Sequence, residues 1–299
     1  MKFIIMGPLT MDTIVREKAV CHSTGGAVYY QAAVLSNLGI DTTAVVTVSK
    51  EDESLLNAFP DDVQVFPVFV DKTMKFKNIY PNHDLNHRIQ RANIPVNPIN
   101  PDNIPELDFK SFDAFLLSPL SPFDIPVETV EYLSQFQIPI YAGVQGYLRY
   151  VNGFEVFLRP WNNFQEFLKF FDGIFLDEME ARVIIGTHVH ELKDVAKTLA
   201  GFGPNEVIIT KGDTGAIVYS GKTDDIYEIP AFTPKQTMDP TGLGDTFMAA
   251  YVTKRMETSD PEICGNFASM TSTIKLESKG TFQGNRNTIE RRLKKISEN

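Results

Sequence analysis

Two glycines and two aspartates stand directly before an apolar run in the stretch DPTGLGDTFMAAYV, residues 239–252. The apolar residues from Phe247 to Val252 recur at helical spacing, so a helix is predicted to begin near Leu243 or Gly244. Backbone N–H groups and the positive end of the helix dipole make such a start an anion site, and glycine lets a ligand approach the main chain closely. Phosphate is the anion that suits this arrangement best.

An aspartate in the same turn would repel a bound anion unless it had a chemical task. Asp245 has such a task if it takes a proton from a nucleophile that attacks the phosphoryl group, as transfer to an alcohol requires. The simpler interpretation is that Asp245 caps the helix and that the glycines only form the turn. For an isolated Gly-x-Gly-Asp the simpler interpretation is the better one, so the rest of the chain must decide.

Short strand-like runs alternate with helical patterns along most of the chain. The strand-like runs include KFIIMG, DTTAVVTVS, DAFLLSP, IPIYAGV, DGIFLD and EVIITKG, and the helical patterns include VYYQAAVLSNLG, VETVEYLSQF, NFQEFLKFF and ELKDVAKTLAGFG. This alternation predicts an α/β fold with a mainly parallel sheet and helices on both faces. The stretch KGDTGAIVYSGKTDDIYEIP, with Gly and Asp turns, predicts a β-meander.

Two segments break the alternation and predict a small β lid. Residues 13–21 and approximately 65–95 are rich in Phe, Val, Thr and Asn, and they suit strands outside the main sheet better than crossover helices. The Pro-rich stretch at residues 94–105 is interpreted as a rigid connection back to the core. We therefore expect a single domain over residues 1–299, with both lid segments inserted within it.

The composition narrows the class of protein. A chain of 299 residues with 43% hydrophobic and 22% charged residues can bury a sizeable core. The net charge of -10 disfavours a nucleic-acid backbone or an anionic membrane as the main partner. The two cysteines, Cys21 and Cys264, fit a reducing compartment, and we find no targeting or membrane-spanning pattern, so we expect a cytoplasmic location.

The chain resembles the PfkB, or ribokinase-like, family of carbohydrate kinases, whose signature is Asp-Thr-Thr-Gly-Ala-Gly-Asp. The stretch from Asp239 to Asp245 is similar to that signature, with Pro240 and Leu243 in place of Thr and Ala. The resemblance implies a ribokinase-like three-layer sandwich in which Asp245 is the catalytic base. The backbone anion hole for the transferred phosphoryl group would be formed by Gly242, Leu243 and Gly244.

Further matches follow in the family's order and imply a substrate site. Asp12 in GPLTMD resembles the aspartate that holds substrate hydroxyls, and a carboxylate can accept two hydrogen bonds from a diol. Gly25 and Gly26 resemble the glycine pair that lets the substrate approach a helix start. Gln31 stands where the family usually has Asn, and Arg149 follows a segment that often contains Asp-x-Asn-x-Arg. Arg149 either touches the substrate or merely ends a strand.

The resemblance also implies ATP and Mg²⁺. Asp177 and Glu180 in LDEMEA match an Asn-x-x-Glu element whose glutamate organises Mg²⁺ through water, although this fragment alone would indicate an acidic helix start. The resemblance leaves open a monovalent cation such as K⁺ near Asp239. The residues implied beside the nucleotide are Thr210, Lys211, Gly212 and Gly215 in VIITKGDTG and, on a late helix, Ala268 and Ser272.

We therefore expect an ATP-dependent phosphotransferase that phosphorylates a hydroxyl of a small sugar or polyol beneath a lid that excludes water. The alternatives are an inositol or nucleoside kinase of the same family and a non-catalytic, sugar-sensing descendant of the fold. A nicotinamide-dependent dehydrogenase is set aside, because the first strand is followed by one glycine, Gly7, instead of Gly-x-Gly-x-x-Gly. The resemblance adds the option of a homodimer formed through the lid.

Overall fold

A large mixed sheet forms the centre of the molecule. The computed structural model describes residues 1–16, 19–80, 89–186 and 191–298. The order of the nine strands is β15 (Asp225–Ile229), β14 (Ala216–Ser220), β13 (Glu206–Thr210), β12 (Gly173–Asp177), β9 (Ile140–Gly143), β8 (Ala114–Leu117), β1 (Lys2–Pro8), β4 (Asp41–Ser49) and β5 (Val63–Val70). All neighbouring pairs from β13 to β5 are parallel, and β14 runs antiparallel to both of its neighbours.

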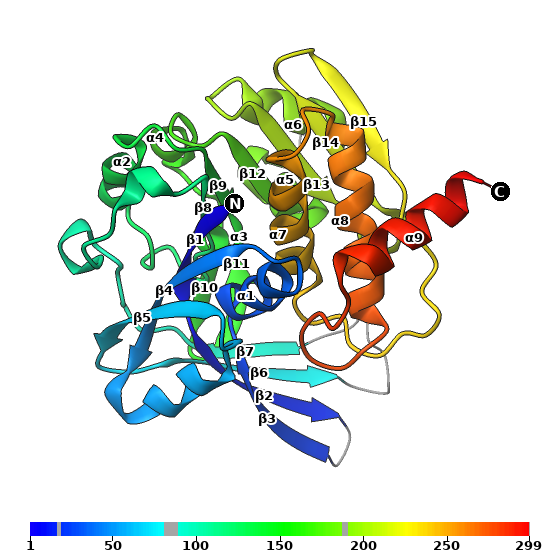
Figure 1. The fold of residues 1–299 in the computed structure, drawn as a ribbon. Helices are drawn as coiled ribbons and strands as arrows, with labels where there is room; N and C mark the ends of the chain where they lie inside the picture. The colour runs from blue at the N-terminus through cyan, green and yellow to red at the C-terminus, as the bar shows by residue number, and fades with distance from the viewer. Residues whose placement is uncertain (17–18, 81–88, 187–190, 299) are drawn as a thin grey trace.

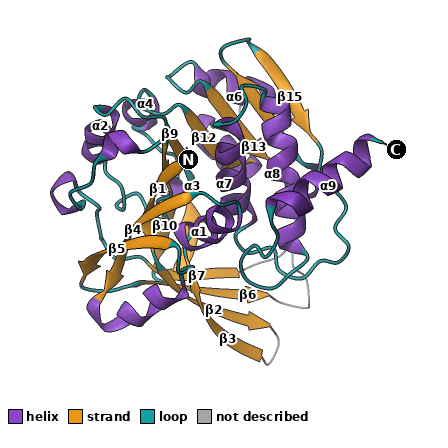
Figure 2. Cartoon of the chain, viewed as in Figure 1, coloured by secondary structure: helices purple, strands orange, loops and turns teal. Residues whose placement is uncertain are grey.

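Helices cover both faces of this sheet (Figures 1 and 2). One face carries α1 (Ala27–Asn37), α7 (Leu243–Arg255), α8 (Pro261–Leu276) and α9 (Arg286–Ser297). The other carries α2 (Val127–Ser134), α3 (Gln145–Leu148), α4 (Phe164–Leu168), α5 (Glu178–Ile185) and α6 (Leu192–Ala200). Short 3₁₀ turns are η1 (Lys50–Ala58), η3 (Pro101–Asn103), η4 (Phe109–Ser111) and η5 (Gly212–Thr214). The predicted α/β fold with three layers is confirmed.

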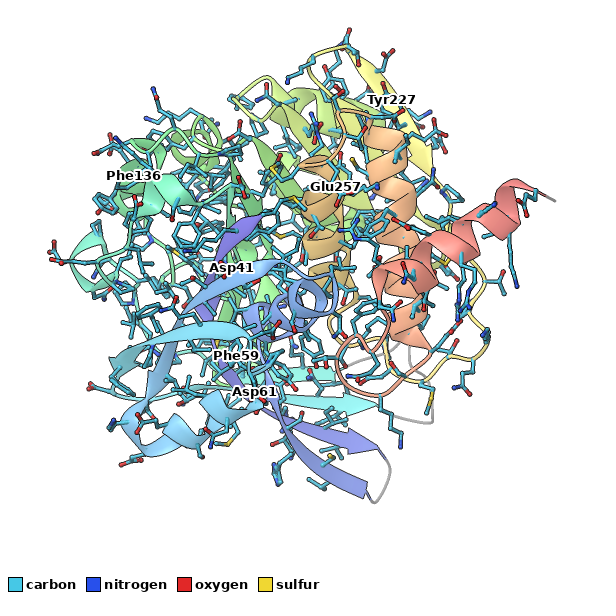
Figure 3. The ribbon with its side chains drawn as sticks, viewed as in Figure 1. Asp41, Phe59, Asp61, Phe136, Tyr227 and Glu257 are labelled. Carbon is cyan, nitrogen blue, oxygen red and sulfur yellow. The ribbon has the colours of Figure 1, made fainter. Side chains whose placement is uncertain are left out.

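Alternate side chains of β1 separate two cores. Phe3 and Ile5 pack with α1, α7 and α8, whereas Ile4 and Met6 pack with the helices of the opposite layer. Successive side chains of a strand point to opposite faces, so a strand covered on both sides must be apolar throughout. Side chains fill the space on both sides of the sheet (Figure 3), where Phe136 marks the α2 layer.

A second sheet of six strands lies at the carboxyl ends of the parallel strands, and its blue and cyan strands are at the bottom of Figure 1. Its order is β10 (Arg149–Asn152), β11 (Glu155–Leu158), β7 (Ile89–Asn93), β6 (Met74–Tyr80), β2 (Thr10–Arg16) and β3 (Ala19–Gly25). Strand β1 is followed after one residue, Leu9, by β2, so the chain passes directly from the large sheet to the small one.

The small sheet differs from the predicted lid in two respects. Residues 65–70 belong to β5, the edge strand of the large sheet, because eight residues of β5 pair in parallel with β4. Strands β10 and β11, which the sequence analysis did not assign to the lid, complete the small sheet by pairing with β7. Residues 17–18 and 81–88 of the predicted lid segments lie outside the described residues.

Two local predictions from the sequence are confirmed. Helix α7 begins at Leu243, directly after Gly242, whose φ of 76° lies in the left-handed region that favours glycine. Strands β13, β14 and β15 form the expected antiparallel meander.

Candidate active site

Two cavities meet at the amino end of α7. The first, of about 340 Å³, lies beneath the small sheet, and the second, of about 850 Å³, lies between the β13–β14 turn and α8. Both volumes are in the range of small-molecule sites. The residues that line both cavities are Thr210, Pro240, Leu243 and Gly244. A molecule in one cavity would therefore reach a molecule in the other at the turn before α7.

Polar side chains from the small sheet face the first cavity. Asp12 on β2 lines it, and its carboxylate accepts a hydrogen bond of 2.7 Å from the Thr10 hydroxyl. Asn78 on β6 also lines it and accepts a 2.9 Å bond from the Gln90 side chain on β7. The Asp12 carboxyl packs against the backbone of Gly25, and a residue with a β-carbon at position 25 would overlap that carboxyl group.

A buried arginine joins the small sheet to the base of the same cavity. Arg149, at the start of β10, is 6% exposed, and its guanidinium carbon lies 5.2 Å from the centroid of the Phe76 ring. Burial and the neighbouring Asp177 raise the pKa of Glu180 to about 7, whereas the charge of Arg149 and a hydrogen bond from Gln145 act to lower it. These side chains all line the first cavity.

The turn before α7 leads from Asp239 to Asp245 at the start of the helix. The first helical bond runs from the Thr246 N–H to the Gly242 oxygen (2.9 Å), so the preceding N–H groups lie outside the helical ladder. Asp245 is half-buried and lines the first cavity. Burial raises the pKa of the Tyr30 phenol, and the nearby carboxylates of Asp12, Asp239 and Asp245 raise it further. The carboxylates of three predicted site residues therefore lie within electrostatic range of one tyrosine on α1.

Asp177 and Glu180 form a capping box at the start of α5. The Asp177 carboxylate accepts from the Glu180 N–H and the Glu180 carboxylate accepts from the Asp177 N–H, both at 2.8 Å. One oxygen of each carboxylate is used in this way. Because Mg²⁺ keeps several waters and takes one or two carboxylates together with phosphates, the pair fits such an ion. Within the described residues, no group of three or more His, Cys, Asp or Glu is arranged to hold a metal.

The second cavity combines glycines with an apolar wall. Gly212 and Gly215 line it at the turn between β13 and β14, and Ser272 lines it from α8. The Ser272 hydroxyl donates to the Leu243 oxygen at 3.3 Å. The apolar part of the lining is supplied by Ala231, Phe232, Pro234, Phe247 and Leu276. Of the residues implied beside a nucleotide, Thr210, Gly212, Gly215 and Ser272 are thus brought together.

Several sequence-predicted site residues lie behind the cavity walls instead of in them. Gln31 is fully buried, and its amide bonds the Ser118 hydroxyl and the Met248 sulfur, so it contacts neither cavity. The burial of Gln31 results from packing against residues distant in sequence, and its place in the motif does not predict that packing. The others that line neither cavity are Gly25, Lys211, Asp239 and Ala268. Gly26 lines the first cavity, as expected.

The sequence analysis missed one buried charged residue next to the site. Lys275 on α8 has no exposed surface, and its ammonium donates to the backbone oxygen of Asp239 at 2.8 Å. Burial lowers the pKa of Lys275 to about 8, although Asp239 and Asp245 act to raise it. A signal was available, because Lys275 continues the buried helical series Cys264, Ala268 and Thr271 at intervals of four, three and four residues.

Part of the chain is similar in sequence to known proteins. The pfkB family carbohydrate kinase model matches residues 155–287. A nucleoside kinase of Methanothermobacter thermautotrophicus is 33% identical over 106 residues, and this stretch spans 33% of the chain and 33% of that relative. The chain thus aligns with about a third of the length of this curated relative.

Solved structures match over nearly the whole chain. A pyrophosphate-dependent kinase in the ribokinase family, complexed with a pyrophosphate analog and myo-inositol, has a TM-score of 0.83 at 22% identity, covering 97% of this chain and 99% of that chain. Arabidopsis thaliana ribokinase, complexed with ribose and ATP, has a TM-score of 0.78 at 18% identity, with 98% of each chain covered. These likenesses show a ribokinase-like fold. The family model adds a likeness to pfkB carbohydrate kinases over residues 155–287, which is less than half of the chain.

The described helices include none that is long and apolar enough to cross a bilayer.

Proposed function

We propose that the protein is an ATP-dependent kinase that phosphorylates a hydroxyl of a small polyhydroxylated acceptor. The observation that carries the proposal is that Asp245 lines the first cavity directly after Leu243 and Gly244, which begin α7 and line both cavities. A phosphoryl donor in the second cavity and an acceptor in the first would meet at an anion site with a carboxylate beside it. Phosphoryl transfer needs little more than positioning and charge stabilisation, which this geometry supports.

The reaction assigns a role to each wall of the site. Asp12, Asn78 and Arg149 hold the acceptor by its hydroxyls in the first cavity. As the acceptor oxygen attacks the γ-phosphorus, its proton passes to the Asp245 carboxylate, the bond to the β–γ bridging oxygen breaks, and ADP leaves. The turn Gly242–Gly244 stabilises the oxygens of the transferring group through backbone N–H groups and the dipole of α7.

Mg²⁺, held by Asp177 and Glu180 with the donor phosphates, would supply neutralising charge when bound. The small sheet covers the first cavity and would exclude the water that would otherwise hydrolyse the donor.

The side chains that line the first cavity indicate the class of acceptor. Its polar lining of carboxylate, amide and guanidinium groups suits several hydroxyls, and Phe76 and Tyr30 provide ring faces. A sugar or cyclitol fits this lining, and the myo-inositol complex of the structural neighbour supports a cyclitol. The 33% identity to a nucleoside kinase supports a nucleoside as the second candidate.

The donor is proposed to be ATP because the second cavity is large and partly apolar. A volume of about 850 Å³ with Phe232, Pro234 and Leu276 in its wall accommodates a base and a ribose beyond the phosphates. Inorganic pyrophosphate, which the structural neighbour uses, would leave that wall without a partner. We also propose a cytoplasmic location, in keeping with a small-molecule kinase.

The test is Mg²⁺-dependent phosphoryl transfer from ATP or pyrophosphate to a panel of pentoses, hexoses, inositols and nucleosides. The Asp245→Asn variant should lose about 10²- to 10⁴-fold in kcat, the usual contribution of a general base. Asp61→Asn, a matched change at an exposed aspartate labelled in Figure 3, should keep full activity, because Asp61 lines neither cavity. Bound ATP without transfer to any acceptor in the panel would favour a sugar-sensing descendant. Absence of ATP and pyrophosphate binding would contradict the kinase assignment.

A further inference from the structure

Lys275 is a buried cation for which the proposed reaction has no direct use. Among the described residues it is the one buried lysine, and it lines neither cavity. A buried ammonium is costly unless hydrogen bonds and opposite charges compensate it. Its position next to the turn before α7, against the backbone oxygen of Asp239, therefore calls for a physical explanation.

The surroundings of the ammonium tie α8 to the turn before α7. The Nζ atom lies 2.8 Å from the Asp239 oxygen and 5.6 Å from the centroid of the Tyr30 ring. The Met238 N–H donates to the Leu276 oxygen at 2.9 Å, which adds a backbone link between the same two segments. The carboxylates of Asp239 and Asp245 both favour the charged ammonium. Lys275 thus touches one side of the turn whose other side faces the cavities.

The residues at Asp239 do not fit a monovalent metal ion there. One carboxylate oxygen of Asp239 accepts from the Thr241 N–H at 3.1 Å, and the other accepts from the Gly280 N–H at 3.2 Å. Its backbone oxygen accepts from Lys275. A K⁺ ion bound to that backbone oxygen would lie against the ammonium, and the two positive charges would repel each other.

We propose that the ammonium of Lys275 is the fixed cation of the phosphoryl site, so that this protein needs no monovalent cation for activity. Held on α8, it fixes the turn through the Asp239 oxygen and places a positive charge behind the anion site. A charge that is already in position needs no rearrangement when negative charge develops at the transferring group. Lys275 is a positioning residue, and this inference rests on the proposed kinase function.

The first test uses the unmodified protein. ADP formation is measured in KCl, NaCl and tetramethylammonium chloride at equal ionic strength, with Mg²⁺ held constant. The rates should agree within about twofold, because the ammonium supplies the charge that an ion would otherwise supply. Stimulation by K⁺ of about fivefold or more would overturn the proposal.

The second test removes the ammonium and asks whether an ion replaces it. Lys275→Ala should lose about tenfold or more in kcat in tetramethylammonium chloride, with little change in the KM of the acceptor. K⁺ or NH₄⁺ should restore much of the rate, because the truncated side chain leaves room beside the Asp239 oxygen. Lys279→Ala, the same change at an exposed lysine four residues away, should show no ion dependence. Full activity of Lys275→Ala in tetramethylammonium chloride would contradict the proposal.

A third readout does not depend on knowing the acceptor. At equal ionic strength, K⁺ should raise the Tm of Lys275→Ala relative to tetramethylammonium and leave the Tm of the unmodified protein unchanged. If no acceptor supports ADP formation, the proposed function fails, but this measurement still shows whether Lys275 occupies a cation position. Stabilisation of the unmodified protein by K⁺ would overturn the inference. If Lys275→Ala does not fold, the ion response of the unmodified protein decides.

Discussion

The ring of Tyr30 lies directly against Gly242, so that a β-carbon at position 242 would overlap the ring. The same ring faces the ammonium of Lys275. Tyr30 therefore joins α1, α8 and the turn before α7, and the signature glycine has two separate reasons to be glycine. One is the φ of 76°, and the other is the contact with the ring.

The two signature glycines should respond differently to alanine. Gly242→Ala should lower the free energy of unfolding by about 3 kcal/mol, through the left-handed backbone and the overlap with Tyr30. Gly244→Ala has nothing within 4 Å of its new β-carbon, and it should raise that free energy by about 0.5–1 kcal/mol inside α7. Urea unfolding of both variants is the measurement. Equal destabilisation by the two changes would argue against the described turn.

We predict that the planar guanidinium of Arg149, and not only its charge, contributes to binding of the acceptor. Arg149→Lys keeps the charge but loses the planar fork and the stacking on Phe76, so the KM of the acceptor should rise about tenfold. The matched control is Arg159→Lys, because Arg159 also lies over lid rings, those of Tyr150 and Phe157, but lines neither cavity. Steady-state kinetics of both variants test the prediction. An unchanged KM in Arg149→Lys would remove Arg149 from the acceptor site.

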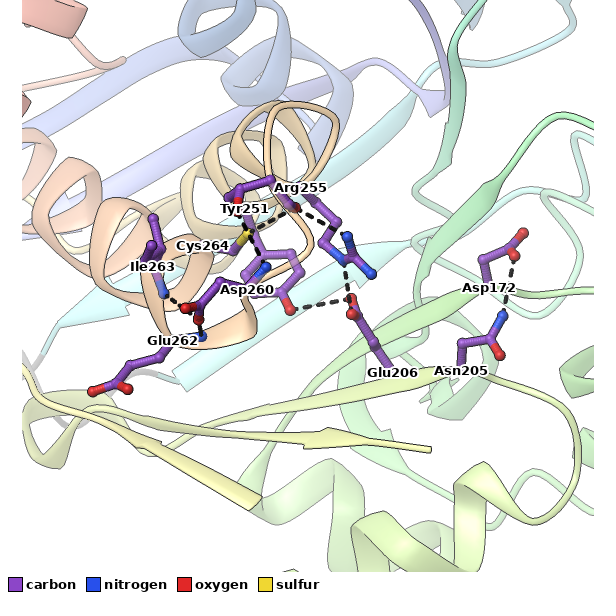
Figure 4. Close-up of polar contacts among 10 residues, drawn as sticks. Asp172, Asn205, Glu206, Tyr251, Arg255, Asp260, Glu262, Ile263 and Cys264 are labelled. Carbon is purple, nitrogen blue, oxygen red and sulfur yellow. Dashed lines mark hydrogen bonds and ion pairs between the residues drawn. The ribbon is translucent and has the colours of Figure 1, made fainter. Parts of the chain in front are cut away.

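A buried network at the start of β13, outside both cavities, should carry stability instead of activity. Glu206 on β13 accepts from the Tyr251 hydroxyl at 3.1 Å and from Arg255 Nε at 2.7 Å (Figure 4). Glu206→Ala leaves both donors without this carboxylate and should lower the free energy of unfolding by about 3 kcal/mol. The exposed pair of Lys193 and Glu228 offers the control, and Glu228→Ala should leave the unfolding midpoint close to that of the unmodified protein.

Asp124 should make stability depend on pH. Burial raises the pKa of Asp124 to about 6, although hydrogen bonds from Ser121 and Leu120 act to lower it. A carboxyl whose pKa is higher in the folded state stabilises the fold at low pH, and this contribution is lost as the pH rises through the folded pKa. The stability of the unmodified protein relative to Asp124→Asn should therefore fall by about 2 kcal/mol between pH 4.5 and pH 7.5. Chemical unfolding at the two pH values measures this change, and a constant difference would contradict the raised pKa.

The sequence determined the layers and the glycine turn before α7 because both depend on local patterns. Runs such as KFIIMG are apolar at every position, and a strand with this pattern must be covered on both faces. The glycines before Leu243 predicted the start of α7 because backbone freedom at a helix start is a property of those residues themselves. The spacing of Asp177 and Glu180 likewise indicated the start of a helix, and the two side chains form a capping box at the start of α5.

Tertiary structure alone decided which strands form the lid and which polar side chains reach the cavities. The sequences of β5, β10 and β11 do not show to which sheet each strand belongs. Strand pairing places β5 in the large sheet and β10 and β11 in the small sheet. Gln31 lies in a motif position yet is buried against Ser118 and Met248, whereas Lys275 lies outside every motif and contacts the turn through Asp239. Burial is set by the surfaces that distant segments bring together, so a side chain's neighbours are fixed only when the whole chain has packed.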